Sequence, residues 1–262
     1  MARWKRSSKF TIPLFALAIA LVLGLTLNIP TQVQAQLTPN SLSRQLPDKW
    51  EFRAPQGSED SIPDNRQGGA SRGDQCIQGV EPLQALVPVA GGTTTAEYPT
   101  ISWYMPKTSA SAAEFVLKDA NQQVVYSTKY MLAKSNKGVV EDTPSIMSLT
   151  LPAFTNLSPL QIGQEYQWSL ALTCNPFDLS GQPVVEGKIK RVDVDPMLAR
   201  RINQAMPQER VALYANARIW YETLSSLVEL QRERPDSPEY TDAVNKLISS
   251  VGLNTTSQQP VY

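Results

Sequence analysis

The chain has 262 residues, with 24 lysines and arginines against 24 aspartates and glutamates, and it contains no histidine. The missing histidine excludes Ser-His-Asp and Cys-His nucleophile systems and the usual imidazole-containing zinc site. The balanced charge gives no electrostatic reason to bind DNA or RNA, and no sequence motif calls for a cofactor.

Residues 1–35 have the pattern of a signal peptide. A basic start (Arg3 to Lys9) precedes an uncharged apolar stretch over 10–27, and Val33-Gln34-Ala35 fits a small-x-small cleavage site. We expect cleavage, a mature start near Gln36, a periplasmic or extracellular location and no permanent membrane span. The alternative is a retained anchor, because the uncharged stretch is at the lower limit for spanning a bilayer.

Residues 36–75 are rich in Pro, Gln, Ser and Gly, and their apolar residues are isolated. We expect a disordered tether that docks locally through Trp50 and Phe52. Its end combines glycines with arginines, which is typical either of an anion-binding nest or of a turn-rich lead into a disulfide. The candidate ligand loop consists of Arg66, Gly68, Gly69, Arg72 and Gly73.

Cys76 and Cys174 are the two cysteines of the chain. In an exported chain an even pair predicts an intramolecular disulfide. A redox-active pair or metal thiolates is the alternative, but there is no CxxC motif and no histidine beside them.

Residues 76–194 show short strands with turn signals and no intervening helix, which predicts an antiparallel sandwich. Thr100–Met105 alternates between polar and apolar residues. The clearest strand is 166–174, in which Tyr166, Trp168 and Leu170 share one face with Cys174. Further strands are expected at 114–118, 123–132, 146–151 and 184–194.

A local motif makes the fold class more specific. Leu160-x-x-Gly163-x-x-Tyr166 resembles the tyrosine corner of fibronectin-III and immunoglobulin-like sandwiches, where the tyrosine hydroxyl bonds to upstream backbone. We therefore expect a mainly β chain: an immunoglobulin/fibronectin-III-like sandwich followed by a C-terminal α-helical hairpin.

Residues 195–254 change to a helical period. Asp195-Pro196 predicts a cap and first turn for a short helix to Met206. A long helix is expected from Pro207 to Arg232, because an apolar seam runs through it without interruption. Ser237-Pro238 opens the last helix, which Gly252 ends, and a disordered tail follows over 255–262.

Two functional interpretations remain open. The preferred one is a non-catalytic interaction module whose helices contact a protein partner or a second copy, with Trp220 and Tyr221 at the contact. The alternative is a binder of a small ligand or glycan, at Trp103-Tyr104 or at the Arg66–Arg72 loop.

A hydrolase built on paired carboxylates is a third interpretation. Asp193 with Asp195, and Glu141 with Asp142, are the acid pairs that the sequence offers. Weak calcium binding is a further alternative for either pair, although neither has ligand spacing beyond two residues. The preferred interpretation is structural: helix capping explains Asp195, and solvation explains the other acids.

Several short motifs together resemble a known family. They are Gly68 to Gly73 before Cys76, Tyr98-Pro-Thr100 before Trp103-Tyr104, the Leu160 to Cys174 stretch, and Ile219-Trp-Tyr221 with Ser250-Val-Gly-Leu253. In this order, over about residues 60–254, the chain is similar to the cyanobacterial domain-of-unknown-function family numbered 928. The resemblance implies an exported cyanobacterial protein and carries no reaction, ligand or catalytic residue.

Overall fold

The computed structural model describes residues 46–52, 64–68, 76–154, 157–178 and 180–253. The expected signal peptide (1–35) and tail (255–262) lie outside these ranges, together with much of the expected tether. The signal peptide, tether and tail therefore stay predictions.

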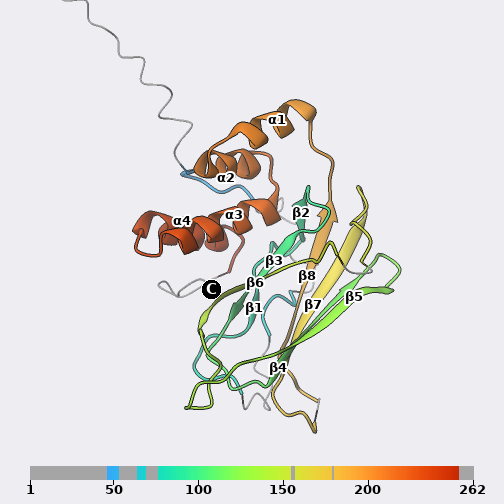
Figure 1. Cartoon of the computed structure of the whole chain (residues 1–262), viewed down its shortest axis with the longest axis vertical. Helices are drawn as coiled ribbons and strands as arrows, with labels where there is room; N and C mark the ends of the chain where they lie inside the picture. Colours follow the sequence, from blue (N-terminus) through green and yellow to red (C-terminus); the bar gives the residue numbers. More distant parts are fainter. Residues whose placement is uncertain (1–45, 53–63, 69–75, 155–156, 179, 254–262) are drawn as a thin grey trace, which may run out of the picture. The chain divides into compact units, whose positions relative to one another are not determined.

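Eight strands precede four helices along the described chain (Figure 1). The strands are β1 (Gln84–Ala85), β2 (Gly92–Thr94), β3 (Thr100–Met105), β4 (Ala112–Lys118), β5 (Val124–Met131), β6 (Ser145–Thr150), β7 (Glu165–Thr173) and β8 (Val184–Arg191). The helices are α1 (Pro196–Gln204), α2 (Pro207–Asn216), α3 (Trp220–Glu233) and α4 (Pro238–Ser250). A mainly β chain with a helical C-terminal part is thus confirmed.

The strands form two sheets. One has three strands in the order β1-β3-β6, and the other has five in the order β2-β8-β7-β4-β5. Neighbouring strands are antiparallel except for β2 and β8, which pair in parallel. This parallel pair corrects the all-antiparallel expectation, because a strand as short as β2 shows no periodicity in the sequence.

Residues of both sheets and of α3 and α4 form one hydrophobic core. On β7 the predicted face is correct, since Trp168, Leu170 and Leu172 are all buried. Phe115 of β4 stacks on Trp168 with ring centroids 6.1 Å apart. Gly187 of β8 lies against the same indole, where a Cβ would approach the ring to 2.6 Å, so the position has room only for glycine.

The tyrosine-corner bond is present at the entry to β7. The backbone N–H of Gln161 donates to the hydroxyl oxygen of Tyr166 at 3.0 Å. Gly163, with a φ of 83°, makes the turn between them. The hydroxyl is therefore bonded to upstream backbone, as the motif predicts.

The helical part differs from the expectation at one point. Asp195 caps α1 as predicted, because its carboxylate accepts from the N–H groups of Met197 at 2.8 Å and Leu198 at 3.2 Å. The expected long helix, however, is divided into α2 and α3. Arg218 lies between them with a φ of 58°, and the hydroxyl of Thr93 donates to its carbonyl at 2.8 Å.

The division has a packing reason. Because α3 starts in a new direction at Trp220, both Trp220 and Tyr221 point at the sheets. A single straight helix would continue in the direction of α2. α3 and α4 then form the expected hairpin over the turn at 234–237 (Figure 1).

Candidate functional site

The candidate ligand loop is partly a structural clamp. Arg66 is 7% exposed, and its guanidinium binds both carboxylate oxygens of Asp64, at 2.7 and 2.6 Å. It also donates to the carbonyls of Val87 at 3.1 Å and Val251 at 2.8 Å. The Arg66 hydrogen bond holds the pKa of Asp64 below its usual range. A side chain so engaged is not available to hold a free anion.

The rest of that loop divides into two groups. The N–H of Gly68 donates to the carbonyl of Leu83 at 2.8 Å, and the N–H of Ala85 donates to the carbonyl of Arg66 at 2.7 Å. Gly68 therefore belongs to a short extended segment beside β1. Gly69, Arg72 and Gly73 lie outside the described residues, so the sequence-based hypothesis for them stays untested.

Trp220 and Tyr221, the residues expected at a partner contact, lie inside the chain and are 1% and 2% exposed. The indole N–H of Trp220 donates to the carbonyl of Leu86 at 3.0 Å. The hydroxyl of Tyr221 accepts from Trp168 Nε1 at 2.8 Å and donates to the carbonyl of Lys188 at 3.0 Å. Both aromatics therefore attach α3 to the chain's own sheets, and their size serves internal packing.

Residues 64–68 and the start of α3 together close one seam between the two sheets. The segment bonds to β1 on one side, and on the other the N–H of Glu186 in β8 donates to the carbonyl of Asn65 at 2.9 Å. Trp220 reaches the first sheet and Tyr221 the second. Phe52 packs on Trp220 with centroids 5.0 Å apart, so the expected docking of this residue is present.

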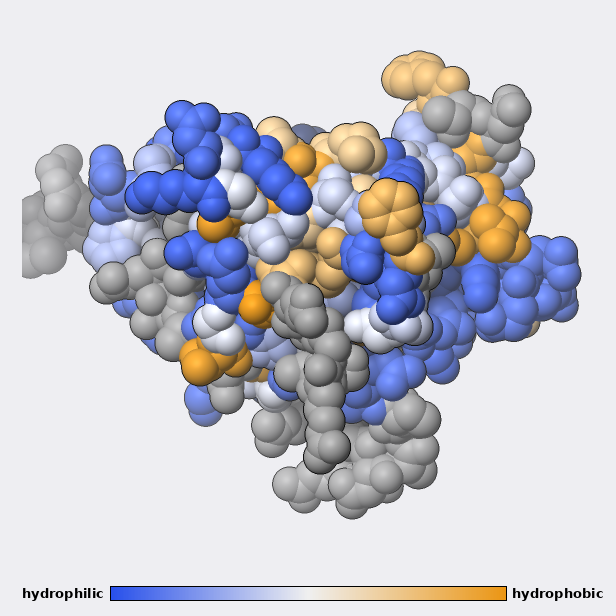
Figure 2. All heavy atoms as spheres, turned by 90° about the horizontal axis from the view of Figure 1, so that it is seen from below, coloured by the Kyte–Doolittle hydropathy of each residue, from blue (hydrophilic) through white to orange (hydrophobic). Residues whose placement is uncertain are grey.

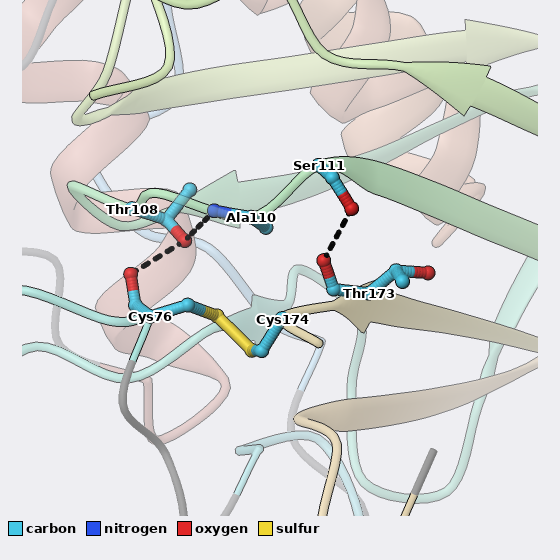
Figure 3. Close-up of a disulfide and its surroundings, with 6 residues drawn as sticks. All are labelled: Cys76, Thr108, Ala110, Ser111, Thr173 and Cys174. Carbon is cyan, nitrogen blue, oxygen red and sulfur yellow. Dashed lines mark hydrogen bonds between the residues drawn. A yellow bond between two sulfur atoms is a disulfide. The ribbon is translucent and has the colours of Figure 1, made fainter. Parts of the chain in front are cut away.

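The predicted disulfide joins Cys76 to Cys174, with Cα atoms 5.3 Å apart (Figure 3). The carbonyl of Cys76 accepts from the hydroxyl of Thr108 at 2.9 Å. Next to Cys174, the carbonyl of Thr173 accepts from the hydroxyl of Ser111 at 3.0 Å. The disulfide therefore fixes the chain at Cys76 to the end of β7, and the hydrogen bond from Thr108 fixes it to the loop before β4.

Trp103 and Tyr104 are 5% and 1% exposed, so Tyr104 offers no surface on which a sugar could stack, and Trp103 lines the groove between β5 and β6 rather than the outer surface. The Tyr104 hydroxyl donates to Glu81, and burial raises the pKa of Tyr104 above its ordinary value. The two rings belong to the packed body of the protein.

Neither acid pair places both carboxylates in one of the grooves described below, since Asp142 lines the groove beside β6 without Glu141. Asp195 caps α1, and the Asp193 carboxylate accepts from the N–H of Val194 at 2.9 Å. Among the described residues, no group of three or more Asp, Glu or Cys side chains lies close enough to hold a metal ion. Within the same ranges, no helix is both long and apolar enough to cross a membrane.

The seam opposite the closed one is open. An apolar groove of about 400 Å³ lies between β6 of the first sheet and β5 of the second. Trp103, Tyr130, Met147 and Leu149 line it, and the indole N–H of Trp103 has no hydrogen-bond partner among the described residues. The groove has the volume of an ordinary ligand or side-chain pocket.

The free edge of β6 borders this groove. Leu151 N donates to the carbonyl of Pro99 at 3.0 Å, and bonded pairs recur every two residues in an antiparallel ladder. Ser145, Met147 and Leu149 therefore bond to β3. Ile146, Ser148 and Thr150 direct their N–H and C=O groups outward, and the described residues give these backbone groups no hydrogen-bond partner. Ser148 and Thr150 are accessible, whereas Ile146 is 4% exposed.

A second groove lies on the other face of β6. It is polar, has a volume of about 430 Å³, and separates the three-stranded sheet from α3. Thr100, Ser148 and Thr150 line it from the sheet, and Glu229 and Arg232 line it from α3. Hydroxyl pairs tie the sheet side together, with Ser102 and Ser148 oxygens 2.9 Å apart and those of Thr100 and Thr150 2.7 Å apart.

β6 also lacks the features that normally protect an edge strand. It carries no charge, proline or bulge, and its pairing with β3 is uninterrupted. The other outer strands differ, because residues 66–68 cover β1 and Lys129 lies on β5. Sequence analysis predicted a strand near 146–151 but missed this site, although an uncharged strand without proline was the available signal.

Exposed apolar side chains elsewhere do not form a comparable site. Figure 2 shows the end of the sheets away from α1 and α2, where apolar residues lie in separate groups divided by polar ones. Val80 and Phe177 are exposed in loops that follow the two cysteines. Single exposed apolar residues are common on soluble proteins and need no partner.

Comparisons with known proteins agree with the sequence motifs. A family model described as Domain of Unknown Function (DUF928) matches residues 67–261. The comparison with curated proteins found no match.

One solved structure is the β-glucuronidase of Parabacteroides merdae with glycerol in its active site. It is similar over 36% of this chain at 15% identity, with a TM-score of 0.19, and this chain covers 11% of its length. A similarity of this size carries no argument about fold or activity.

Proposed function

Since the chain belongs to the DUF928 family, whose description assigns no activity, we propose a function from the geometry: an exported, non-catalytic module that binds an extended polypeptide segment along β6. The proposed location is the periplasm or the extracellular space. The Cys76–Cys174 disulfide supports export, because such bonds persist in oxidising compartments. The tyrosine-corner bond supports an immunoglobulin/fibronectin-III-like arrangement of the sheets.

The single observation that carries the proposal is the row of outward N–H and C=O groups on Ile146, Ser148 and Thr150. An extended segment that adds to a sheet edge satisfies such groups with main-chain hydrogen bonds. Water satisfies them too, so affinity depends on what the side chains of the segment bury.

The two grooves supply that burial and make it selective. Successive side chains of an added strand point to opposite faces of the sheet. One set enters the apolar groove beside Met147 and Leu149, and the other enters the polar groove beside Ser148 and Thr150. The site therefore selects a segment in which apolar and hydroxyl or amide side chains alternate.

The closed seam supports this mode of binding. There the chain's own residues 65–68 lie extended between β1 and β8, with backbone bonds to both. The same kind of occupant suits the open seam.

The experiment measures binding of a fluorescein-labelled hexapeptide with the sequence of residues 145–150, by fluorescence anisotropy against the purified chain. We expect saturable binding. A peptide of the same composition, with its apolar residues placed together, is expected to bind at least tenfold more weakly because it cannot fill both grooves.

A matched pair of variants tests the edge itself. Ser148→Pro removes one outward N–H while leaving the ladder to β3 intact, and Ser148→Ala removes the same hydroxyl but keeps the N–H. We expect about tenfold weaker binding for Ser148→Pro than for Ser148→Ala, with unchanged circular dichroism in both. Absence of binding to the parent chain, or equal binding by both variants, contradicts the proposal.

A further inference from the structure

Resting on the proposed function, we infer that the occupant of the β6 edge is a second copy of this chain. Its β6 pairs antiparallel with the first β6 about a two-fold axis at Ser148. The three-stranded sheets of the two copies then form one continuous six-stranded sheet. The inference rests on the backbone register, the two faces of β6 and the charge along it.

The register satisfies every outward backbone group. With Ser148 opposite Ser148 of the second copy, Ile146 of each chain lies opposite Thr150 of the other. These are the three residues whose N–H and C=O groups point away from β3. Each residue exchanges two hydrogen bonds with its partner, so no outward group is left over. A two-fold axis makes one strand complementary to itself in this way.

The orientation of the two faces of β6 can also be derived for this pairing. A two-fold axis perpendicular to the sheet leaves each face of the second strand on the same side as in the first. Met147 and Leu149 of the second copy therefore lie over the apolar groove, and its Ser148 and Ile146 lie beside Ser148 and Thr150 at the polar groove. From Met147 to Thr150, β6 has the alternation that its own edge selects, whereas Ile146 adds an apolar side chain on the polar face.

Charge distinguishes β6 from the other open edge. β6 has no ionisable side chain, so no like charges lie opposite each other along the paired strands. The outward residues of β5 include Lys129, so self-pairing of β5 would bring two lysines into the interface, directly opposite each other when the axis passes through Lys129. Like charges directly opposite destabilise a strand pair, so the second copy is expected at β6.

Sedimentation velocity across a hundredfold range of concentration tests the inference. We expect a monomer–dimer equilibrium for the parent chain and for Ser148→Ala, and a monomer for Ser148→Pro. Unchanged circular dichroism and a cooperative thermal transition verify that the proline variant is folded. A parent chain that is monomeric throughout, or a Ser148→Pro chain that remains dimeric, overturns the inference.

A charge-pair experiment tests the register without proline. Ser148→Lys and Ser148→Glu each place like charges at the two-fold axis, so each variant alone is expected to be monomeric. Their equimolar mixture is expected to dimerise, because a lysine then faces a glutamate. A mixture that stays monomeric while the parent chain dimerises overturns the pairing at Ser148.

The outcomes separate this inference from the proposed function. Hexapeptide binding by a strictly monomeric chain supports strand addition and overturns the second copy as occupant. A parent dimer that the hexapeptide dissociates supports both. Neither peptide binding nor dimerisation overturns both.

Discussion

Arg66 contacts one neighbour in the sequence and two residues that are distant from it. Its guanidinium bonds to Asp64, to the carbonyl of Val87 and to the carbonyl of Val251. The sequence shows an arginine among glycines, a pattern that equally fits an anion-binding loop. Only the folded chain brings the carbonyls of Val87 and Val251 to this side chain, so its structural role could not be predicted from spacing.

The Asp64–Arg66 pair predicts an acid-dependent loss of stability. The pKa of Asp64 is lowered by the Arg66 hydrogen bond, so the carboxylate stabilises the fold above its unfolded pKa of about 3.9. That stabilisation is lost as the pH falls through the lower folded pKa. Because the Asp64 side chain is 44% exposed, solvent screening limits the effect to about 1 kcal/mol.

Urea unfolding of the parent chain and of Asp64→Asn at pH 7, 5 and 3 measures this difference. We expect the variant to be less stable at pH 7 and pH 5, and the gap to narrow at pH 3. Asp242→Asn, an exposed position on α4, serves as control and should match the parent chain. A gap that is as large at pH 3 as at pH 7 contradicts the prediction.

Individual strands and helices show which patterns in the sequence are informative. Thr100–Met105 has the predicted bounds, and β7 is displaced by one residue from its prediction, because regular alternation marks a half-buried strand. β1 and β2 have two and three residues, too few for any period. Their positions depend on partners that are distant in the chain.

The division between α2 and α3 was missed for a related reason. The apolar seam of the expected long helix continues through Ala217 and Trp220, and no proline or glycine interrupts it. Arg218 adopts the left-handed conformation because the aromatic side chains after it must reach the sheets. Tertiary contacts here outweigh the local helical preference.

Glycine in place of Arg218 should stabilise the folded chain. Arg218→Gly removes the cost of a left-handed non-glycine residue, and its ion pair with Glu51 is exposed on both sides. We expect a gain of about 0.5–1 kcal/mol in the free energy of unfolding, measured with urea. Lys246→Gly, within α4 and exposed, is the control and should lose about 1 kcal/mol. A loss of stability in Arg218→Gly would show that the arginine side chain holds the turn.

The free edge of β6 was likewise beyond sequence reasoning. The strand itself was predicted near 146–151, and its lack of charge is visible in the sequence. Which strand lies at an edge, and which grooves border it, depends on the order of strands in the sheet. Ser148 becomes a candidate site residue only once that order is known.

The two seams between the sheets differ in structure. One is closed by residues 64–68, α3 and their hydrogen bonds, and the other is a groove. The disulfide reinforces the body at Cys76, just after the segment that closes the first seam. The stabilising contacts thus lie at one seam, and the proposed binding site lies at the opposite one.

Removing the disulfide should lower stability strongly without changing the fold. Cys76 and Cys174 are 98 residues apart, and closing a loop of that length contributes about 4 to 5 kcal/mol on chain-entropy grounds. Urea midpoints of the oxidised parent chain and of the Cys76→Ala/Cys174→Ala double variant measure the loss. Reductant should shift the parent chain and leave the double variant unchanged. Equal midpoints in the oxidised state would mean that the bond contributes little.

The bond from Arg66 to the carbonyl of Val251 spans 185 residues of sequence, so it has a consequence for the timing of folding. A nascent chain leaves the ribosome in order, and Val251 emerges long after Arg66. Until then the guanidinium lacks one acceptor and the first seam stays incomplete. We therefore expect native closure only after translation has passed residue 251. The seam that this hydrogen bond completes is therefore expected to be among the last parts of the fold to form.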